Sequence, residues 1–414
     1  MKFDKLYAFD TRPLSALADI QTGPFGSQLH KEDYVENGTP IVTVEHLGNR
    51  VFTEQNLPCV LQTDRDRLSK YTLREGDIIF SRVGSVDRCS FVDKEHDGWM
   101  FSGRCLRVRP YGIIDPMFLY YFFCLESTKQ YVRNIAVGAT MPSINTKLLG
   151  EIPITFPHRN EQRRIASILA SIDDKIENNA KINENLEQQA LALFRHYFMD
   201  YAPYGGNAPA GWAETSLDDV CTRITDGSHY SPADSPDSPY PMYSVKDMET
   251  YGFNPSSCKH ITEEEFLKMR KNDCVPLLND ILVAKDGSYL KEIFICSEEK
   301  DEAILSSIAI FRPDTSIIMP EILLYLLKQP SVRKDVGDNY VSGSALPRIV
   351  LKDFKKYRFL LPPMDEQLKI GSVLHAIRMK TKANTDETQR LSSLRDALLP
   401  RLMSGELDIS TLDL

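Results

Sequence analysis

Two stretches of the chain decide the fold, because one is a copy of the other. Residues 156–165 read Phe-Pro-His-Arg-Asn-Glu-Gln-Arg-Arg-Ile and residues 361–370 read Leu-Pro-Pro-Met-Asp-Glu-Gln-Leu-Lys-Ile, an offset of 205 (366 − 161) at the shared Glu. In both, a Pro precedes Glu-Gln and apolar residues follow at helical spacing, which is typical of a helix start. An internal repeat sets the whole architecture, so it is established before any single element is assigned.

The repetition extends upstream in the same order. The matching pairs are residues 138–142 with 343–347, 76–85 with 279–288, and 40–44 with 241–245. The offset drifts from 205 (343 − 138) through 203 (280 − 77) to 201 (241 − 40), as small loop insertions would produce. Chance similarity would not preserve this order. Each half is therefore predicted to be about 150 residues of mixed strand and short helix, followed by one long helix.

Size and composition fit two globular units. The 414 residues exceed what one hydrophobic core usually organises, and 42% apolar with 26% charged residues is ordinary for a folded protein. The eight cysteines are scattered singly, with no spacing typical of zinc, so we expect reduced packing residues and no metal site. The net charge of −9 argues against nucleic-acid binding, unless basic residues cluster locally or partner subunits supply phosphate contacts.

Nothing in the sequence predicts contact with a membrane. Residues 1–10 lack the basic segment and apolar core of a secretory signal. The best apolar run, residues 117–125, is too short to span a bilayer. We therefore expect a cytoplasmic protein with no membrane partner.

The two long helices carry an apolar seam for a partner helix. The seam positions are Ile165, Leu169, Ile172, Ile176, Leu186, Ala190, Leu193 and Tyr197 in the first helix, and Ile370, Leu374, Ile377, Leu391, Leu398 and Leu402 in the second. Steps of four and three give a period of about 3.5 residues, which is typical of coiled coils. The alternative is that each helix is amphipathic and packs only on its own domain.

Each seam is interrupted by polar residues near its middle. Asn179 and Asn183 interrupt the first helix, and Thr381, Asn384 and Thr388 interrupt the second. A buried polar layer fixes register at some cost in stability. Parallel and antiparallel pairing would both bring these groups together. We favour antiparallel pairing, because it relates the two repeats by a pseudo-two-fold axis and makes a spacer of roughly 50 Å from about 35 helical residues.

This arrangement resembles the specificity subunit of type I restriction-modification systems over nearly the whole chain. The resemblance rests on the repeat, on the two helix starts, and on Leu-Pro-Arg-Leu-Met-Ser-Gly-Glu-Leu at residues 399–407. It implies an α+β fold in which two mixed α/β target-recognition domains, in pseudo-two-fold repeat, are separated by two long helices forming an antiparallel coiled coil. The expected domains are residues 1–157, 158–200 (central helix), 201–362, and 363–414 (C-terminal helix and tail).

The resemblance also implies function and partners. Each target-recognition domain of that family reads one half of a split site on double-stranded DNA, and the helices set the spacer between the halves. Two methyltransferase subunits dock on the chain, bind S-adenosylmethionine and methylate adenine, and motor-nuclease subunits complete the restriction enzyme. The chain itself would be non-catalytic and would hold no cofactor.

Paired loops supply the candidate DNA contacts. Arg82 and Ser85 follow a predicted strand in the first copy, as Lys285 and Ser288 do in the second, and a basic side chain beside a Gly turn suits contact with phosphates or base edges. The family places a second pair of stretches near DNA, and there the candidates are Ser143, Asn145 and Arg348. A solvated turn or a purely structural loop is about equally consistent with these sequences.

A third loop pair and an arginine strip are weaker candidates. Residues 23–28 and 226–230 could bring Gln28 and His229 to base edges, although a plain turn fits better. Arg104, Arg107 and Arg109 could form a basic strip, since the last two share a strand face, but a solvated face is the simpler interpretation.

The sequence predicts no active site. The Asn/Asp-Pro-Pro-aromatic motif of adenine methyltransferases and the phosphate loop of nucleotide motors are both missing, and no His has metal spacing or a plausible nucleophile. Asp280 with Glu298 faintly resembles a nuclease metal site, in a match too short to carry weight. The rival functions are thus a stand-alone nuclease using Asp280 and a coiled-coil adaptor that binds proteins.

Overall fold

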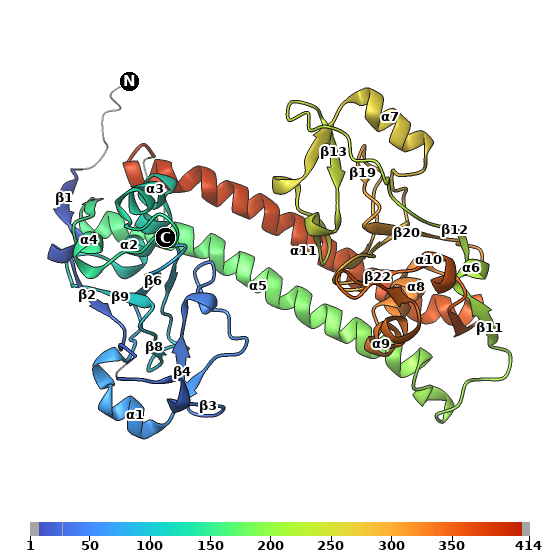
Figure 1. Cartoon of the computed structure of the whole chain (residues 1–414), viewed down its shortest axis with the longest axis horizontal. Coiled ribbons are helices and arrows are strands. Elements are labelled where there is room, and N and C mark those ends of the chain that lie inside the picture. Colours follow the sequence, from blue (N-terminus) through green and yellow to red (C-terminus); the bar gives the residue numbers. More distant parts are fainter. Residues whose placement is uncertain (1–7, 27, 408–414) are drawn as a thin grey trace. The chain divides into compact units, whose positions relative to one another are not determined.

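The computed structural model describes residues 8–26 and 28–407. Residues 1–7 of the segment predicted to lack a secretory signal, Ser27 of the third loop pair, and residues 408–414 of the predicted tail lie outside this range. The chain forms two compact units (Figure 1). Unit 1 runs to Glu177 and resumes at Gln389, and unit 2 is Asn178–Thr388, so each long helix contributes to both units.

Unit 1 begins with short strands and ends on a long helix. Its elements are β1 (Asp10–Pro13), β2 (Ala18–Thr22), β3 (Tyr34–Val35), β4 (Thr39–Val42), β5 (Cys59–Val60), α1 (Gln62–Arg67), β6 (Ile78–Ser81), β7 (Cys89–Phe91), β8 (Met100–Phe101), β9 (Cys105–Pro110), α2 (Pro116–Cys124), α3 (Glu126–Ile135), α4 (Thr146–Gly150), β10 (Pro153–Phe156) and the long helix α5 (Arg159–Phe198). Short 3-10 turns lie at Leu14–Ala16, Lys31–Asp33, Val44–His46 and Ser69–Tyr71.

Unit 2 repeats this order. Its elements are β11 (Ala213–Ser216), α6 (Leu217–Val220), β12 (Cys221–Asp226), β13 (Tyr240–Tyr243), β14 (Met248–Glu249), β15 (Gly252–Phe253), β16 (Lys259–Ile261), α7 (Glu263–Lys271), β17 (Ile281–Ala284), β18 (Ile293–Ile295), β19 (Ala303–Ile304), β20 (Ile308–Pro313), α8 (Pro320–Leu327), α9 (Pro330–Asn339), β21 (Val341–Ser342), β22 (Arg348–Ile349), α10 (Leu351–Phe354), β23 (Arg358–Leu361) and the long helix α11 (Met364–Ser404). Its 3-10 turns lie at Ala202–Tyr204, Val245–Asp247 and Pro255–Ser257.

The sheets of the two units have one topology. Unit 1 contains an antiparallel sheet in the order β2-β9-β6-β7, and unit 2 contains β12-β20-β17-β18. A parallel pair, β4 with β8 or β13 with β19, follows in each, and β1 with β10 or β11 with β23 joins the first strand to the last. The predicted internal repeat and the mixed strand-and-helix fold are confirmed.

The central strand of each sheet is buried on both faces, because successive side chains point to opposite sides. In β6, Ile78 and Phe80 pack with the helices α2 and α3, whereas Ile79 packs into a second core with Ile41 and Phe101. In unit 2, β17 divides its side chains between two cores in the same way. Each unit therefore has a helix-covered core and a second core under its loops.

The Glu-Gln motif of the repeat is explained by the glutamine. In unit 1 the Gln162 side chain accepts a hydrogen bond from the Asp115 backbone N–H (2.7 Å) and donates to the Pro157 carbonyl (2.9 Å). In unit 2 Gln367 accepts from the Met319 N–H (2.9 Å) and donates to Pro362 (2.9 Å). Both amides are buried, so they satisfy backbone groups that would otherwise be unpaired, and they fix the start of each long helix to α2 or α8.

The two long helices pair in antiparallel orientation. In unit 1, Ile165 and Leu169 of α5 share a core with Leu399 and Leu402 of α11. In unit 2, the amide of Asn179 contacts Thr388, and the amide of Asn183, one turn later in α5, contacts Thr385 and Thr381, earlier in α11. The antiparallel coiled coil expected from the sequence is therefore present.

The last part of the predicted seam is wrong by one residue. The structure buries Ala190, Phe194 and Phe198, whereas Leu193 and Tyr197 are only partly buried. The spacing there is four residues, because this end of α5 packs on the helix-covered core of unit 2 as well as on α11. A straight helix of about 3.6 residues per turn drifts away from a heptad seam when no supercoil is imposed.

The predicted polar residues meet in one buried layer. Asn384 donates to the Asn183 side-chain oxygen (2.8 Å), and Asn183 donates to the Thr381 carbonyl (3.2 Å). Asn179 donates to the Glu387 carboxylate (2.9 Å) and contacts Thr388. Tyr251 of unit 2 donates to the Asn183 carbonyl (3.3 Å). The polar side chains of this layer thus form most of their hydrogen bonds with the opposite helix.

None of the described helices combines the length and apolar character needed to cross a membrane.

We expect Asn183→Ala to lower the free energy of unfolding by about 1–3 kcal/mol, because it leaves the buried Asn384 amide without its acceptor. Urea-induced unfolding measures the change. Gln188→Ala is the matched control, since Gln188 is an exposed amide on the same helix, and it should leave the midpoint unchanged. Equal midpoints for the two variants would show that the layer does not stabilise the pair.

Candidate nucleic-acid interface

In unit 1, the three loops chosen from the sequence lie together. The Gly84 N–H donates to the Pro142 carbonyl (2.8 Å) and the Ile144 N–H donates to the Arg82 carbonyl (3.0 Å), which joins two of them. The Arg82 guanidinium donates to the Gly103 carbonyl (3.1 Å) and lies 5.9 Å from the centre of the Phe25 ring, which brings in the third. We call residues 23–26, 28, 82–85 and 137–145 loop cluster 1.

Unit 2 assembles its loops with the same hydrogen bonds. The Gly287 N–H donates to the Pro347 carbonyl (2.7 Å) and the Ile349 N–H donates to the Lys285 carbonyl (3.0 Å). The Lys285 ammonium forms an ion pair with Asp226 of the third loop. Residues 226–230, 285–288 and 343–349 form loop cluster 2. The backbone of the two clusters is therefore a shared framework.

Glycine permits the close approach of the third loop in both units. A Cβ atom at Gly23 would lie 2.2 Å from the Ser102 carbonyl oxygen, and one at Gly227 would lie 2.3 Å from that of Ile304. Any side chain would push the loop away from the sheet, because backbone atoms cannot yield. The two glycines thus hold equivalent loops in equivalent places.

The candidates in loop cluster 1 differ in how far the fold already engages them. Arg82 is half-buried and has no carboxylate partner among the described residues, and Ser85 is exposed. The Gln28 side-chain oxygen accepts from the Tyr71 hydroxyl (2.8 Å). The Ser143 hydroxyl donates to the Val137 carbonyl (3.1 Å), and the Asn145 side chain caps α4. Arg82 therefore keeps the most capacity for a ligand.

The cations of loop cluster 2 are partly neutralised. Lys285 is only 6% exposed and is paired with Asp226, so a direct DNA contact would require this ion pair to open. His229 is exposed, with its Nε2 3.3 Å from the same carboxylate, and Ser288 is exposed. Arg348 is exposed and lies 3.6 Å from Asp286. The roles of all these residues on DNA stay predictions.

Arg107 and Arg109 form neither the candidate basic strip with Arg104 nor the solvated face that the sequence favoured. Arg107 is buried and donates to Asp19 (2.6 Å), and burial lowers its pKa. Arg109 makes two hydrogen bonds of 2.7 Å to the buried Asp77, which raises the pKa of Arg109. Only Arg104 is exposed. Their shared face lies against other parts of the unit, so they stabilise the fold.

The carboxylate of the nuclease hypothesis has a structural partner. Both oxygens of Asp280 accept from Arg312 at 2.8 Å, and Asp280 is fully buried. The pair is the counterpart of Asp77 with Arg109 in unit 1. Glu298 is exposed and pairs with Lys300 (3.1 Å). In the range that the structure describes, no three His, Cys, Asp or Glu side chains are grouped to hold a metal ion.

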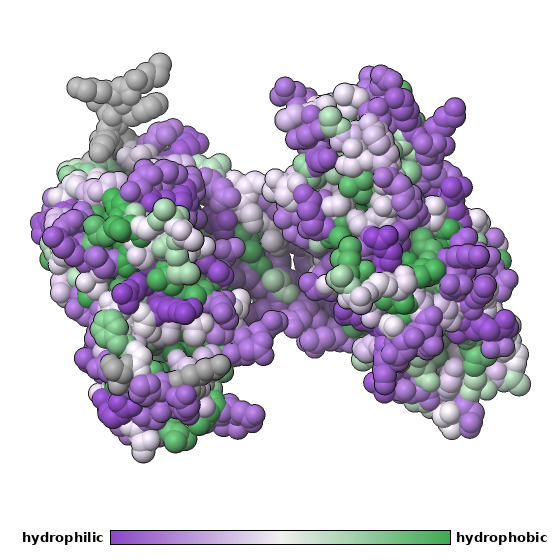
Figure 2. All heavy atoms as spheres, in the orientation of Figure 1, coloured by the Kyte–Doolittle hydropathy of each residue, from purple (hydrophilic) through white to green (hydrophobic). Residues whose placement is uncertain are grey.

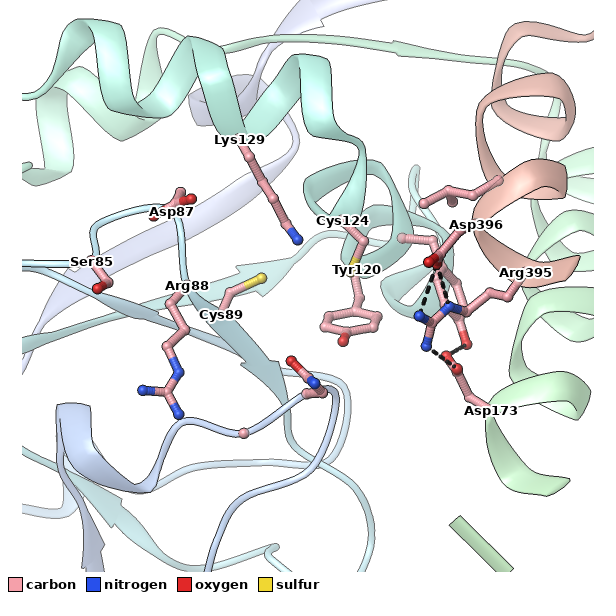
Figure 3. A pocket seen from close by; sticks show the side chains of 14 residues that line it. Ser85, Asp87, Arg88, Cys89, Tyr120, Cys124, Lys129, Asp173, Arg395 and Asp396 are labelled. Atoms are coloured by element: carbon pink, nitrogen blue, oxygen red, sulfur yellow. Dashed lines mark hydrogen bonds and ion pairs between the residues drawn. The ribbon is translucent and has the colours of Figure 1, made fainter. Parts of the chain in front are cut away.

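A polar pocket of about 390 Å³ lies next to loop cluster 1, and no sequence pattern predicted it (Figure 3). Ser85, Arg88 and Lys129 lie on its wall, and Arg395 donates to Asp173 (2.8 Å) at its far side. A hydrogen bond to Cys124 and burial raise the pKa of the Cys89 thiol, which keeps it protonated and unreactive. The wall is assembled from residues far apart in sequence.

The fold and the loops define a class of protein: a duplicated recognition module that presents two loop clusters of different chemistry on one repeated framework. Comparison with known families agrees with this class. The model of the type I restriction modification DNA specificity domain matches residues 8–188 and again residues 209–393. The chain belongs to this family, with two copies of the domain, and it is a component that gives DNA sequence specificity and not a catalytic subunit.

Individual relatives support the assignment. The chain is 28% identical to the MjaIX specificity subunit of Methanocaldococcus jannaschii over 73% of this chain and 71% of that protein. It is 25% identical to the HindI specificity subunit of Haemophilus influenzae over 90% and 95%. The crystal structure of the S subunit of a type I system from M. genitalium aligns with a TM-score of 0.63 over 97% of this chain and 98% of that one, at 18% identity, which supports the fold.

We expect Asp280→Ala to lower the free energy of unfolding by up to about 3 kcal/mol. This is the lower end of the range for removing one partner of a buried ion pair, because Arg312 reaches solvent and its charge can be hydrated. Thermal or urea-induced unfolding measures this. Glu298→Ala, an exposed carboxylate, is the control and should not change stability. A variant of either residue that folds normally but loses a DNA-cleaving activity would revive the nuclease hypothesis.

Proposed function

We propose that this chain reads a split, asymmetric site on double-stranded DNA, one half with each loop cluster, and directs methylation of one adenine in each half by two methyltransferase subunits. S-adenosylmethionine would bind to those subunits. Where a motor-nuclease subunit is present, the same recognition would direct restriction. The action would take place in the cytoplasm.

One observation carries the proposal: the two loop clusters have the same backbone arrangement but different side chains. Equivalent hydrogen bonds fix Gly84 to Pro142 and Gly287 to Pro347. The cation on this framework is Arg82, stacked near Phe25, in unit 1 and Lys285, neutralised by Asp226, in unit 2. A common framework suits a common ligand, and different side chains suit different base sequences.

The adaptor hypothesis explains less. A protein-binding scaffold has no need for two glycines that hold equivalent loops against equivalent carbonyls beside a cation. The family match also concerns DNA specificity. The chain has a net charge of −9, and carboxylates pair with the cations of loop cluster 2, so partner subunits would supply much of the phosphate contact.

The direct test is to co-express the chain with its methyltransferase subunit and to map modified adenines across the host genome. We expect a motif of two different short blocks separated by a fixed number of unspecified bases, because the side chains of the two clusters differ. A continuous motif, or a palindrome of two identical blocks, would contradict the proposal. The absence of any motif would reject a role in methylation.

Arg82→Ala should weaken binding by about 1–3 kcal/mol and relax selectivity in one half-site only. Arg348→Ala should do the same in the other half-site. Binding of duplexes with single base changes in each block measures both effects. Arg358→Ala is the control, because Arg358 is exposed but pairs with Glu214 on a strand away from the clusters. Equal losses in both half-sites would contradict separate reading.

A further inference from the structure

Several large hydrophobic side chains of the loop clusters are exposed: Phe25, Val137 and Met141 in loop cluster 1, and Tyr230 and Leu346 in loop cluster 2. Met141 is 66% exposed and Leu346 is 54% exposed. They occupy matching positions in the repeat, at the offset of 205 (346 − 141), and each directly precedes a proline. Exposed apolar residues are ordinary on protein surfaces, and Figure 2 shows them between hydrophilic residues on both units. The exposure of Met141 or Leu346 alone is therefore no evidence of a function. An exposed apolar residue at the same position in both repeats does need an explanation.

The backbone presents both side chains through the same turn. Gly138 has a φ of +111° and Gly343 a φ of +91°, values that favour glycine. A Cβ atom on Gly138 would lie 2.7 Å from the Met141 carbonyl oxygen, and one on Gly343 would lie 2.7 Å from that of Leu346. Both copies thus retain a tight turn that requires glycine and that ends on an apolar side chain.

The position of these turns points to DNA as the ligand. The proline after each apolar residue accepts the hydrogen bond from Gly84 or Gly287 that assembles the cluster. Arg82 lies on the loop bonded to Pro142, and Arg348 follows Pro347 and is exposed. Cations beside an apolar tip fit a nucleic acid better than an apolar protein surface.

A second pair of exposed apolar residues at matching positions does not share this setting. Ile113 and Ile317 (317 − 113 = 204) are exposed and precede α2 and α8, beside the segments that the buried glutamines hold. They belong to the helix starts and not to the loop clusters. Phe25 and Tyr230 are exposed within the clusters as well, and Phe25 lies 5.9 Å from Arg82, but neither ends the glycine turn that Met141 and Leu346 share.

The side chains that differ between the two clusters and those that are alike suggest different kinds of contact with DNA. Side chains that read bases should differ between the units, as Arg82 and Lys285 do. Met141 and Leu346 are alike in size and polarity, so they suit a step that both half-sites need whatever their sequence. Adenine methylation supplies one, because the target base must leave the stack before the enzyme can reach it.

We propose that Met141 and Leu346 are apolar wedges, each of which enters the duplex beside the target adenine of its own half-site and stabilises the extruded state of that base. An apolar side chain inserted at a base step compensates part of the lost stacking. The wedge is a positioning residue: it contacts the DNA, and the partner methyltransferase carries out the transfer. This inference rests on the proposed function above.

The test uses the complete complex of this chain with its methyltransferase, once its motif has been mapped. Duplexes methylated in advance in one half allow the single-turnover rate to be measured for each adenine separately. Met141→Ala should slow methylation in the half-site read by unit 1 by about tenfold and leave the other half unchanged, and Leu346→Ala should do the reverse. Affinity for the duplex should stay near the wild-type value.

Two further variants separate a wedge from a structural role. Exchange of the side chains, as Met141→Leu with Leu346→Met, should keep both rates, because apolar size is retained. A mismatched base opposite the target adenine should restore the rate of each alanine variant, since a mismatched base costs less to extrude. Leu267→Ala is the control, because Leu267 is 52% exposed on α7, outside loop cluster 2.

The outcomes are distinct. Half-specific loss with mismatch rescue supports the wedge. Equal loss at both adenines, loss that a mismatch does not restore, or no loss at all overturns it while the mapped motif still stands. If the wild-type complex has no motif, the proposed function fails before the wedge is tested.

Discussion

The hydrogen bond between Asn183 and Asn384 is the constraint on which the helix pair depends. Both side chains are almost fully buried, and the 2.8 Å contact between them is possible in one register only. A slip of one heptad would move the helices by about 10 Å and leave both amides unpaired. Apolar seam residues tolerate such a slip far better, because after it each of them still packs against another apolar residue. The amides therefore supply the specificity and the leucines most of the stability.

The glutamines at the helix starts extend this control to the recognition domains. Gln162 and Gln367 bond the first turn of each long helix to the backbone that begins α2 or α8. These helices cover the sheet from which the recognition loops emerge. These buried hydrogen bonds thus connect each long helix to the backbone that supports a loop cluster. The side chains of the loops take no part in these bonds, so they can vary without disturbing the connection.

The sequence predicted the frame well and the loop chemistry poorly, and the reason is physical. The repeat, the antiparallel helices and the amide layer follow from periodic patterns, because helix geometry places residues three and four apart on one face. Ion pairs such as Lys285 with Asp226 or Asp280 with Arg312 join residues far apart in the chain. No periodicity encodes such pairs, so a basic residue at a strand end could be read as a DNA contact although its charge is already neutralised.

The same pairs explain why several arginines of the sheets add little positive charge to the surface. Arg107, Arg109 and Arg312 are held by carboxylates within their own sheets, so they add little to the field outside the protein. In unit 1, by contrast, Arg82 at the centre of the cluster donates to the Gly103 carbonyl and lies over the Phe25 ring. Weak overall attraction to phosphates reduces binding at random sequences, since the sequence-independent contribution scales with the number of phosphates neutralised. An acidic reader therefore depends more on base contacts than on phosphate contacts, which favours binding at the correct sequence.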